Sequence, residues 1–154
     1  MATATSSESS TLHGYCALYP LILTNAKFTT FIHSQLRGLA RLRKVSPDPT
    51  AELNPETAAR FLIKDKEWML IESPKGSIRA HARVTDRILP WVICCQAGWW
   101  QSCEELGLPG YDPYSSDGAN VSALVGTELV DPISGATPNR SYLCRVRPLK
   151  STDS

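Results

Sequence analysis

Polar and cationic side chains cluster directly after the first hydrophobic segment of the chain. They belong to Thr24, Asn25, Lys27, Thr29, Thr30, His33 and Ser34, with the small residue Ala26 among them. No acidic residue occurs between Glu8 and Asp48. Hydroxyl groups, backbone N–H groups and cations are the groups that bind phosphate in proteins. Taken alone, however, a basic segment of this kind is more simply explained as a face exposed to solvent.

The sequence lacks the short motifs of known catalytic chemistry. It contains no GxSxG turn, no GxxxxGK[ST] loop, no GxGxxG after a strand and no HExxH helix. The three histidines, His13, His33 and His81, are scattered, and the five cysteines show no paired CxxC spacing. The sequence therefore predicts no catalytic residue and no metal ligand, and it favours binding over bond-making.

Length and composition set the broad class. The chain has 154 residues, a hydrophobic content of 42% and a net charge of +1, which suit a single globular domain. Near-neutral charge argues against broad nucleic-acid binding. No apolar run reaches the roughly 18 residues of a membrane span, and no secretory signal is recognisable. We expect a cytoplasmic protein with a disordered leader over 1–17, one domain over 18–149 and a polar tail over 150–154.

Hydrophobic patterning predicts mostly strands. Alternating or continuous apolar runs favour strands over 19–24, 51–54, 66–73, 77–85, 90–96 and 141–149. Pro74-Lys75-Gly76 favours a hairpin turn between two of them. A helix is predicted from Pro55 to about Lys64, with Asn54 as its cap. A short or weak helix over 34–45 would place Arg37, Arg41 and Lys44 on one face. These elements indicate a β-barrel-like domain with a few short helices.

The order of several sequence blocks resembles a known family. The blocks are YPLILTNAKFTTFIHSQLRGLARLRKVSPDP, then LNPETAARFLIKDKEWMLIESPKGSIRAHARVTDRILPWVICCQAGWW, then GANVSALV and DPISGATPNRSYLCRVRPL. Together they are similar to the C-terminal dinucleotide-binding domain of molybdopterin oxidoreductases of the dimethyl sulfoxide reductase family. Gly98-Trp99-Trp100 resembles most the formate dehydrogenase and acetylene hydratase branches. The resemblance covers about Tyr19 to Pro148 and implies a mainly β fold, a double-psi β-barrel with a few short helices.

The resemblance also implies a cofactor and the residues that bind it. Family members bind the guanosine diphosphate part of molybdopterin guanine dinucleotide, whose molybdenum or tungsten lies at the far end of the cofactor. The corresponding positions here are Thr24, Asn25, Ala26, Lys27, Thr29, Thr30, His33, Ser34 and Asn120.

Several positions depart from the family pattern. Ala26 stands for the usual loop glycine, and Lys27 stands for an arginine, which removes a bidentate donor. Leu62 replaces a helix-ending glycine, Trp91 replaces a glycine before a strand, and Ala97 replaces a common histidine. These departures concern the affinity for the cofactor more than the fold.

The chain has no room for the iron–sulfur and metal-ligand domains of family enzymes. We therefore expect no catalysis by this chain alone. It would be a small subunit, or a detached C-terminal domain, of an oxidoreductase whose large catalytic subunit carries an iron–sulfur cluster. Trp91, Trp99 and Trp100 would then form the subunit contact or pack in the core. The alternatives are a carrier or storage protein for the cofactor, a degenerate fragment, or a barrel that binds peptides or nucleic acid.

Overall fold

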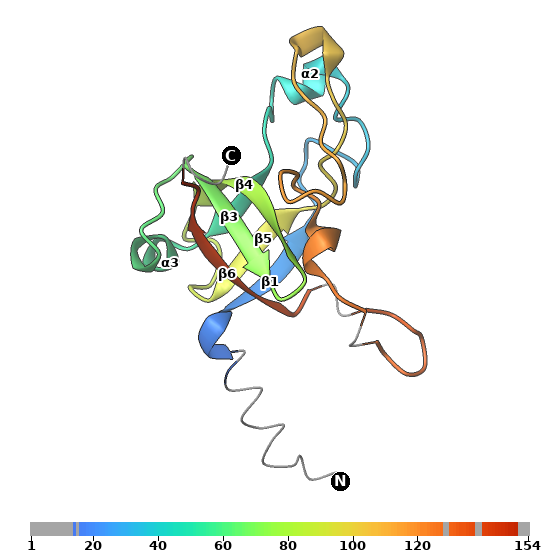
Figure 1. Cartoon of the computed structure of the whole chain (residues 1–154). Helices are drawn as coiled ribbons and strands as arrows, with labels where there is room; N and C mark the ends of the chain where they lie inside the picture. The colour runs from blue at the N-terminus through green and yellow to red at the C-terminus, as the bar shows by residue number, and fades with distance from the viewer. Residues whose placement is uncertain (1–13, 15, 128–129, 138–139, 151–154) are drawn as a thin grey trace.

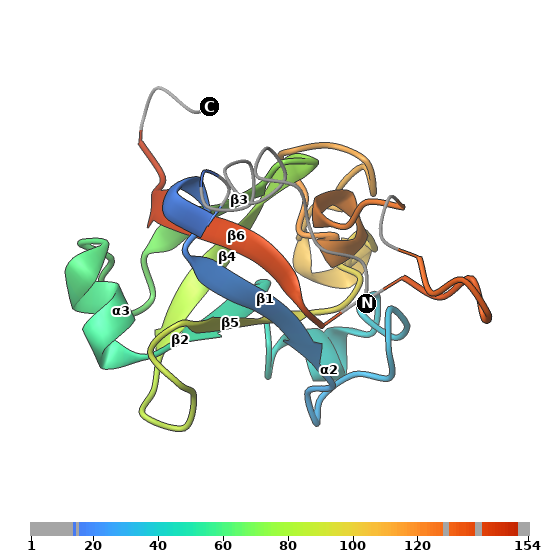
Figure 2. The ribbon, with the colours of Figure 1, turned by 90° about the horizontal axis from the view of Figure 1, so that it is seen from below.

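The computed structural model describes residues 14, 16–127, 130–137 and 140–150. Most of the predicted leader and of the polar tail lies outside these residues. Six strands form a closed barrel in the order β1-β5-β2-β4-β3-β6, shown in Figure 1 and from below in Figure 2. The strands are β1 (Leu21–Ala26), β2 (Thr50–Leu53), β3 (Trp68–Ser73), β4 (Gly76–Val84), β5 (Val92–Gln96) and β6 (Tyr142–Pro148). The predicted mainly β barrel with a few short helices is confirmed.

The barrel contains both parallel and antiparallel pairs, and several neighbouring strands are far apart in the sequence. Strand β1 pairs in parallel with β5, and β2 pairs in parallel with β4. The remaining four pairs are antiparallel, and β6 closes the barrel between β1 and β3. Closure leaves no strand edge within the barrel unpaired.

Side chains of alternate residues fill the barrel interior. In β4, Ile78, Ala80 and Ala82 are buried, whereas Arg79 and Arg83 point to the outer face and form ion pairs there. This is the alternation that the sequence predicts for a half-buried strand. The β3–β4 hairpin is also as predicted, because Ser73 pairs with Gly76 across the two residues between them.

Helix α3 (Pro55–Arg60) covers one end of the barrel and has clear signals at both ends. The Asn54 side chain accepts a hydrogen bond from the backbone N–H of Glu56 at 2.9 Å, and Pro55 occupies the first helical position. Leu62, with a φ of 56°, then reverses the chain. The N–H of Ile63 donates to the carbonyl of Ala58, a Schellman ending that stops the helix before Lys64.

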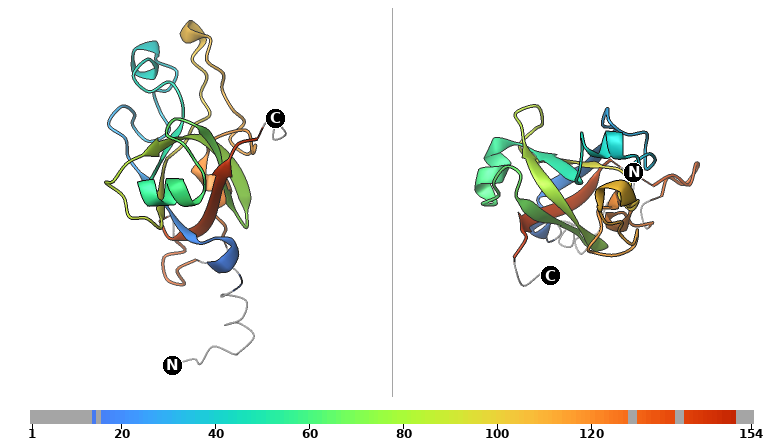
Figure 3. Two further views of the ribbon diagram at one scale, coloured as in Figure 1. Left: turned by 90° about the vertical axis from the view of Figure 1, so that its left-hand side faces the viewer. Right: turned by 90° about the horizontal axis from the view of Figure 1, so that it is seen from above.

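A lobe projects from one end of the barrel and is made of residues 27–49 and 97–119 (Figures 1 and 3). It contains the four-residue helix α2 (Ala40–Arg43) and the 3₁₀ turn η1 (Glu104–Leu106). A second 3₁₀ turn, η2 (Val121–Leu124), lies beside the barrel. We call the part formed by residues 27–49 and 97–119 the projecting lobe. Its own small core contains Phe31, Trp99 and Ala119.

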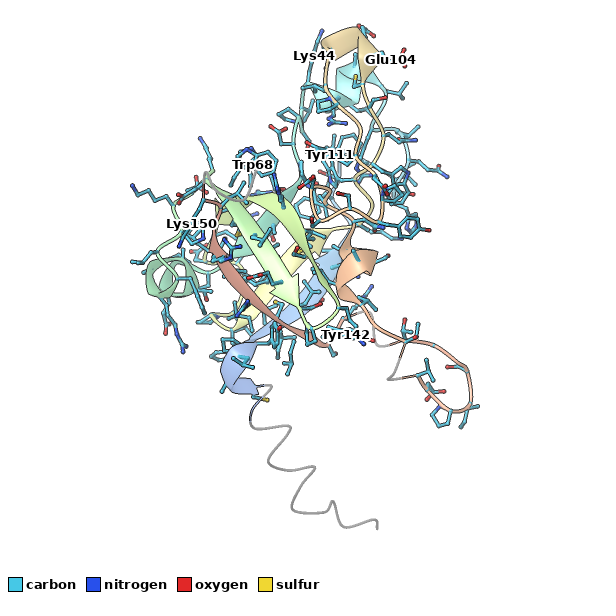
Figure 4. The ribbon with its side chains drawn as sticks, viewed as in Figure 1. Lys44, Trp68, Glu104, Tyr111, Tyr142 and Lys150 are labelled. Carbon is cyan, nitrogen blue, oxygen red and sulfur yellow. The ribbon has the colours of Figure 1, made fainter. Side chains whose placement is uncertain are left out.

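The predicted helix over 34–45 is wrong in extent, and its basic face does not form. Arg37 precedes α2 and is only 2% exposed, so it does not share a surface with Arg41. Lys44 lies at the tip of the projecting lobe, as does Glu104 (Figure 4). The physical reason is tertiary: the Arg37 side chain donates to the carbonyls of His33 and Ala97, and these bonds hold the backbone in an irregular path.

Within the described part of the chain, no helix is both long and apolar enough to cross a membrane.

Candidate functional site

A cavity of about 160 Å³ lies where the projecting lobe joins the barrel. The end of β1, the loop after it, the end of β5 and the segment before β6 all contribute to its wall. The lining residues are Asn25, Ala26, Lys27, Phe28, Phe31, His33, Arg37, Gln96, Ala97 and Arg140. Three of them are cations, and none is a carboxylate. We call it the cationic pocket.

Arg37 is the buried cation of this pocket. One guanidinium nitrogen donates to the His33 carbonyl at 2.8 Å, and the other donates to the Ala97 carbonyl at 2.6 Å. Its Nε is buried and has no hydrogen-bond partner. Burial, and secondarily the charge of Arg43, lowers the pKa of Arg37 to about 10. A bound anion would reverse this penalty, because an opposite charge favours the protonated form.

The Trp99 ring supports both buried arginines. The Arg37 and Arg43 guanidinium groups lie 4.9 Å and 4.6 Å from its ring centroid. The Trp99 indole N–H donates to the Gln96 side chain at 2.5 Å, and Arg43 donates to the carbonyls of Pro47 and Gln101. The cation–π contacts and the Arg43 hydrogen bonds hold the two segments of the lobe together, and the Trp99–Gln96 bond joins the lobe to β5. The 1% exposure of Trp99 assigns it to the core.

A larger cavity of about 660 Å³ adjoins the cationic pocket. Its walls come from the segments 28–30 and 45–48, from Asp65 and Lys66, and from residues 81–84 of β4. Phe28 and Gln96 line both cavities, so the two share a wall. Unlike the cationic pocket, this cavity contains carboxylates as well as cations. We call it the mixed pocket.

The structure distributes the predicted site residues over several places. Asn25, Ala26, Lys27 and His33 line the cationic pocket. Thr29 and Thr30 line the mixed pocket instead. Their roles toward a ligand remain predictions.

The other three predicted residues line neither cavity. Thr24 pairs with Cys94 inside the sheet. Ser34 lies so close to Gly98 that a Cβ at this glycine would stand 2.5 Å from the serine Cβ. Asn120 caps η2 through the N–H of Ser122 and donates to the Pro113 carbonyl at 2.8 Å.

Sequence reasoning missed six of the ten lining residues, and two of these six, Arg37 and Arg140, are cations. Arg140 lies more than 100 residues from Lys27 in the sequence, and only barrel closure brings the two together. Arg37 falls within the acid-free segment but was expected on a surface helix. The absence of carboxylates between Glu8 and Asp48 is the sequence feature that could have indicated Arg37.

No residue of helix α2 lines the cationic pocket, and the positive groups of the pocket are the side chains of Lys27, Arg37 and Arg140. None of the ten lining residues is an acid that would compete for these cations. The residues present therefore suit a phosphate or diphosphate.

The cysteines are packed rather than arranged for chemistry. Cys94, Cys95, Cys103 and Cys144 are buried and free, and Cys16 is exposed. Burial raises the pKa of the Cys94 thiol to about 11 and that of the Cys144 thiol to about 12. No group of three potential ligands for a metal ion exists among the described histidines, cysteines and carboxylates.

Comparison with known proteins identifies a family model that matches most of the chain. The model described as the molydopterin dinucleotide binding domain matches residues 21–142. The chain is 31% identical over 129 residues to a dopamine dehydroxylase of Eggerthella lenta, covering 83% of this chain and 12% of that protein. It is 26% identical over 130 residues to formate dehydrogenase 2 subunit alpha (cytochrome c-553) of Nitratidesulfovibrio vulgaris, covering 73% of this chain and 13% of that protein.

A solved structure has the same fold. Acetylene hydratase from Pelobacter acetylenicus superimposes with a TM-score of 0.76 at 22% identity, covering 94% of this chain and 20% of that one. The chain thus spans between 12% and 20% of the length of these proteins.

Proposed function

Because the chain belongs to the molydopterin dinucleotide binding domain family, we propose that it binds the guanosine diphosphate part of molybdopterin guanine dinucleotide, with the diphosphate in the cationic pocket. The observation that carries this proposal is Arg37, a buried guanidinium without a carboxylate partner and with an unpaired Nε in the described structure. A buried charge is costly unless it is paired, and a diphosphate oxygen would pair it.

Each cation of the pocket has a distinct part in this proposal. Arg37 is held in place by its two backbone carbonyls and supplies a preorganised charge. Lys27 and Arg140 are exposed and reach the ligand from opposite ends of the sequence. The bound cofactor supplies the chemistry of its molybdenum or tungsten ion, whereas the residues of this chain bind and orient its nucleotide end.

We also propose that the chain works with a large catalytic subunit that carries an iron–sulfur cluster, as a small subunit or detached C-terminal domain. The relatives named as a dehydroxylase and a formate dehydrogenase subunit support this, because the aligned part is only 12% and 13% of their lengths. A cytoplasmic location belongs to the same proposal and is supported by the free, buried thiols.

A cofactor carrier is the second candidate function. The specific observation in its favour is that this chain brings three cations, Lys27, Arg37 and Arg140, to one pocket. The presence of the cationic pocket despite Ala26 and Lys27 supports both functions over a degenerate fragment.

Binding of guanosine diphosphate to the full chain tests the proposal. Replacing Lys27 or Arg140 with alanine is expected to weaken binding about three- to fivefold, because each is an exposed charge contact worth up to about 1 kcal/mol. Titration calorimetry at low and moderate salt would measure the loss, and added salt should weaken wild-type binding.

Arg41→Ala is the matched control. Arg41 is an exposed cation of α2 that does not line the cationic pocket, so its removal should leave the affinity unchanged. Equal losses in Lys27→Ala and Arg41→Ala would show that binding follows net charge alone, and the cationic pocket would lose its role.

A further inference from the structure

A small groove lies at the end of the barrel remote from the cationic pocket. Strands β1 and β5 run in parallel, from the side of α3 toward α2 (Figure 2). Their last residues, Ala26 and Gln96, line the cationic pocket. Leu21, which begins β1, and Trp91, which precedes β5, instead line a groove of about 80 Å³ beside α3. We call this groove the α3 groove; the length of a strand, about 17 Å, separates it from the cationic pocket.

Trp91 is a large aromatic side chain left in solvent at the α3 groove. It is 53% exposed, and Phe61 and Pro90 line the groove beside it. Leu62, which directly follows Phe61 in the chain, is 80% exposed, and Leu89 is 58% exposed. Single exposed apolar residues are common on protein surfaces, whereas apolar residues gathered around a groove mark an interaction site.

The fold itself gains little from Leu62 and Trp91. Leu62 has a φ of 56°, a conformation that is unfavourable for a residue with a Cβ, and most of its side chain meets water. Both residues stand where the resemblance implies a glycine. A contact outside the isolated chain would remove their apolar surface from water and so make both side chains favourable.

Hydrogen bonds fix the backbone on both sides of the Trp91 side chain. The Trp91 carbonyl accepts a hydrogen bond from the Ile22 N–H at 2.8 Å. The Thr57 hydroxyl of α3 donates to the carbonyl of Pro90, the preceding residue. An aromatic residue on a fixed backbone loses little conformational freedom when it is buried in a contact, which favours affinity.

Two opposite charges of α3 border the same groove. Glu56 and Arg60 both line it, and their spacing of four residues places them on one face of the helix. Neither forms an ion pair with another residue in the described part of the chain. In a pair of chains related by a twofold axis, Glu56 of each chain can face Arg60 of the other. The surface is thus complementary to itself in charge, as an isologous contact requires.

We propose that a second copy of this chain docks on the α3 groove and forms a twofold dimer. Trp91 of each copy would pack against the groove of the other, and Glu56 of each would pair with Arg60 of the other. The aromatic rings supply the affinity, and the charges fix the orientation. The dimer leaves the cationic pocket open, because a strand length separates the two. This inference goes beyond the proposed function and does not depend on cofactor binding.

The mass of the full chain in solution measures this association. Sedimentation equilibrium should give a mass that approaches twice the chain mass of 16.9 kDa as the concentration rises. Trp91→Ala is expected to raise the dissociation constant of the dimer at least about thirtyfold, because buried aromatic anchors dominate such contacts and the twofold axis removes two of them.

Tyr114→Ala is the matched control for the loss of an exposed aromatic side chain. Tyr114 is 89% exposed, but it belongs to the projecting lobe and does not line the α3 groove. Its removal should leave the dissociation constant unchanged. Equal losses in Trp91→Ala and Tyr114→Ala would show that exposed aromatic residues associate without a specific surface, and this would overturn the inference.

Charge reversals test the twofold geometry itself. Glu56→Lys and Arg60→Glu each place like charges opposite one another, so each is expected to weaken self-association about tenfold. An equimolar mixture of the two variants should regain the affinity of the wild type, because a chain with two cations then meets a chain with two anions. A variant that fails to fold could not show this recovery, and thermal melting of each variant would confirm its folding.

Three results would overturn the inference. A wild-type chain that stays monomeric up to about 100 μM, where even a weak interface assembles, is the first. Self-association that survives Trp91→Ala and shows no recovery in the mixture would place the contact elsewhere. A monomeric chain that loses a larger native partner on Trp91→Ala would assign the α3 groove to that partner. The affinity for guanosine diphosphate tests the proposed function separately from all three.

Discussion

Single residues decide how strongly this domain could bind an anion. Lys27 stands where the resemblance implies an arginine, so the fork that grips a phosphate with two donors is absent from the loop. Arg37 supplies a guanidinium at the same pocket from ten positions further along the chain. Its position on Trp99 and between two backbone carbonyls makes that guanidinium rigid.

The loop after the first strand could be predicted from the sequence as part of the candidate site, whereas Arg37 and Arg140 could not. The acid-free segment pointed to the loop after the first strand, and residues of this loop line the cationic pocket. The burial of Arg37 was not visible, since it depends on the Ala97 carbonyl 60 residues away. Arg140 joins the pocket only through strand pairing, for which a single sequence carries no direct signal.

Thiol reactivity should report the burial of the cysteines. Cys16 is exposed and the other four thiols are buried, and burial disfavours the reactive thiolate by raising its pKa at Cys94, Cys95 and Cys144. A disulfide reagent at neutral pH is expected to modify one thiol per native chain and all five after denaturation. Cys16→Ser should abolish the fast reaction; a fast reaction that survives would show that the barrel opens readily.

At the scale of elements, the sequence predicted strands well and the lobe poorly. Strand β4 alternates cleanly because one of its faces is buried and the other meets solvent. Its predicted range, 77–85, differs by one residue at each end from Gly76–Val84. The lobe has no such periodicity. Long-range side-chain hydrogen bonds determine the path of its backbone. The local pattern of residues 34–45 therefore predicts a helix of which only a small part forms.

The end of helix α3 carries a strain that can be removed. Leu62 adopts a φ of 56° although its side chain is 80% exposed and packs little. Leu62→Gly is expected to raise the free energy of unfolding by about 1 kcal/mol, because glycine adopts this conformation without a Cβ penalty. Denaturant titration would measure the gain, which corresponds to about 3 °C in the melting temperature.

Leu62→Ala separates conformation from side-chain loss. It truncates the same side chain but retains the Cβ, so it should not stabilise the protein. Equal gains in both variants would attribute the effect to the removal of an exposed leucine instead of to backbone strain.

The whole molecule joins a closed barrel to a lobe with its own small core, and both cavities lie at their junction. The pattern of strands and turns in the sequence was enough to predict a barrel-like domain, whereas the closed strand order is visible only in the structure. Of the three tryptophans expected at a contact or in the core, Trp99 is in the core and Trp91 is 53% exposed. An exposed Trp91 suits an interface.

Purification from a native source would test the assembly. We expect the chain to elute together with a much larger subunit, and the complex to contain molybdenum or tungsten and a pterin. The measurement is size-exclusion chromatography followed by metal and pterin analysis. A free monomer that carries the pterin would favour the carrier function, and a free monomer without it would contradict both.

Strand β6 is the last of the six strands to be synthesised, yet it lies between β1 and β3 and pairs with both. Until residues 142–148 emerge, the nascent chain exposes two unpaired strand edges that another polypeptide can join. Synthesis stopped just before Tyr142 should therefore yield a product prone to aggregation or dependent on chaperones, even though most of its hydrophobic residues would already be present.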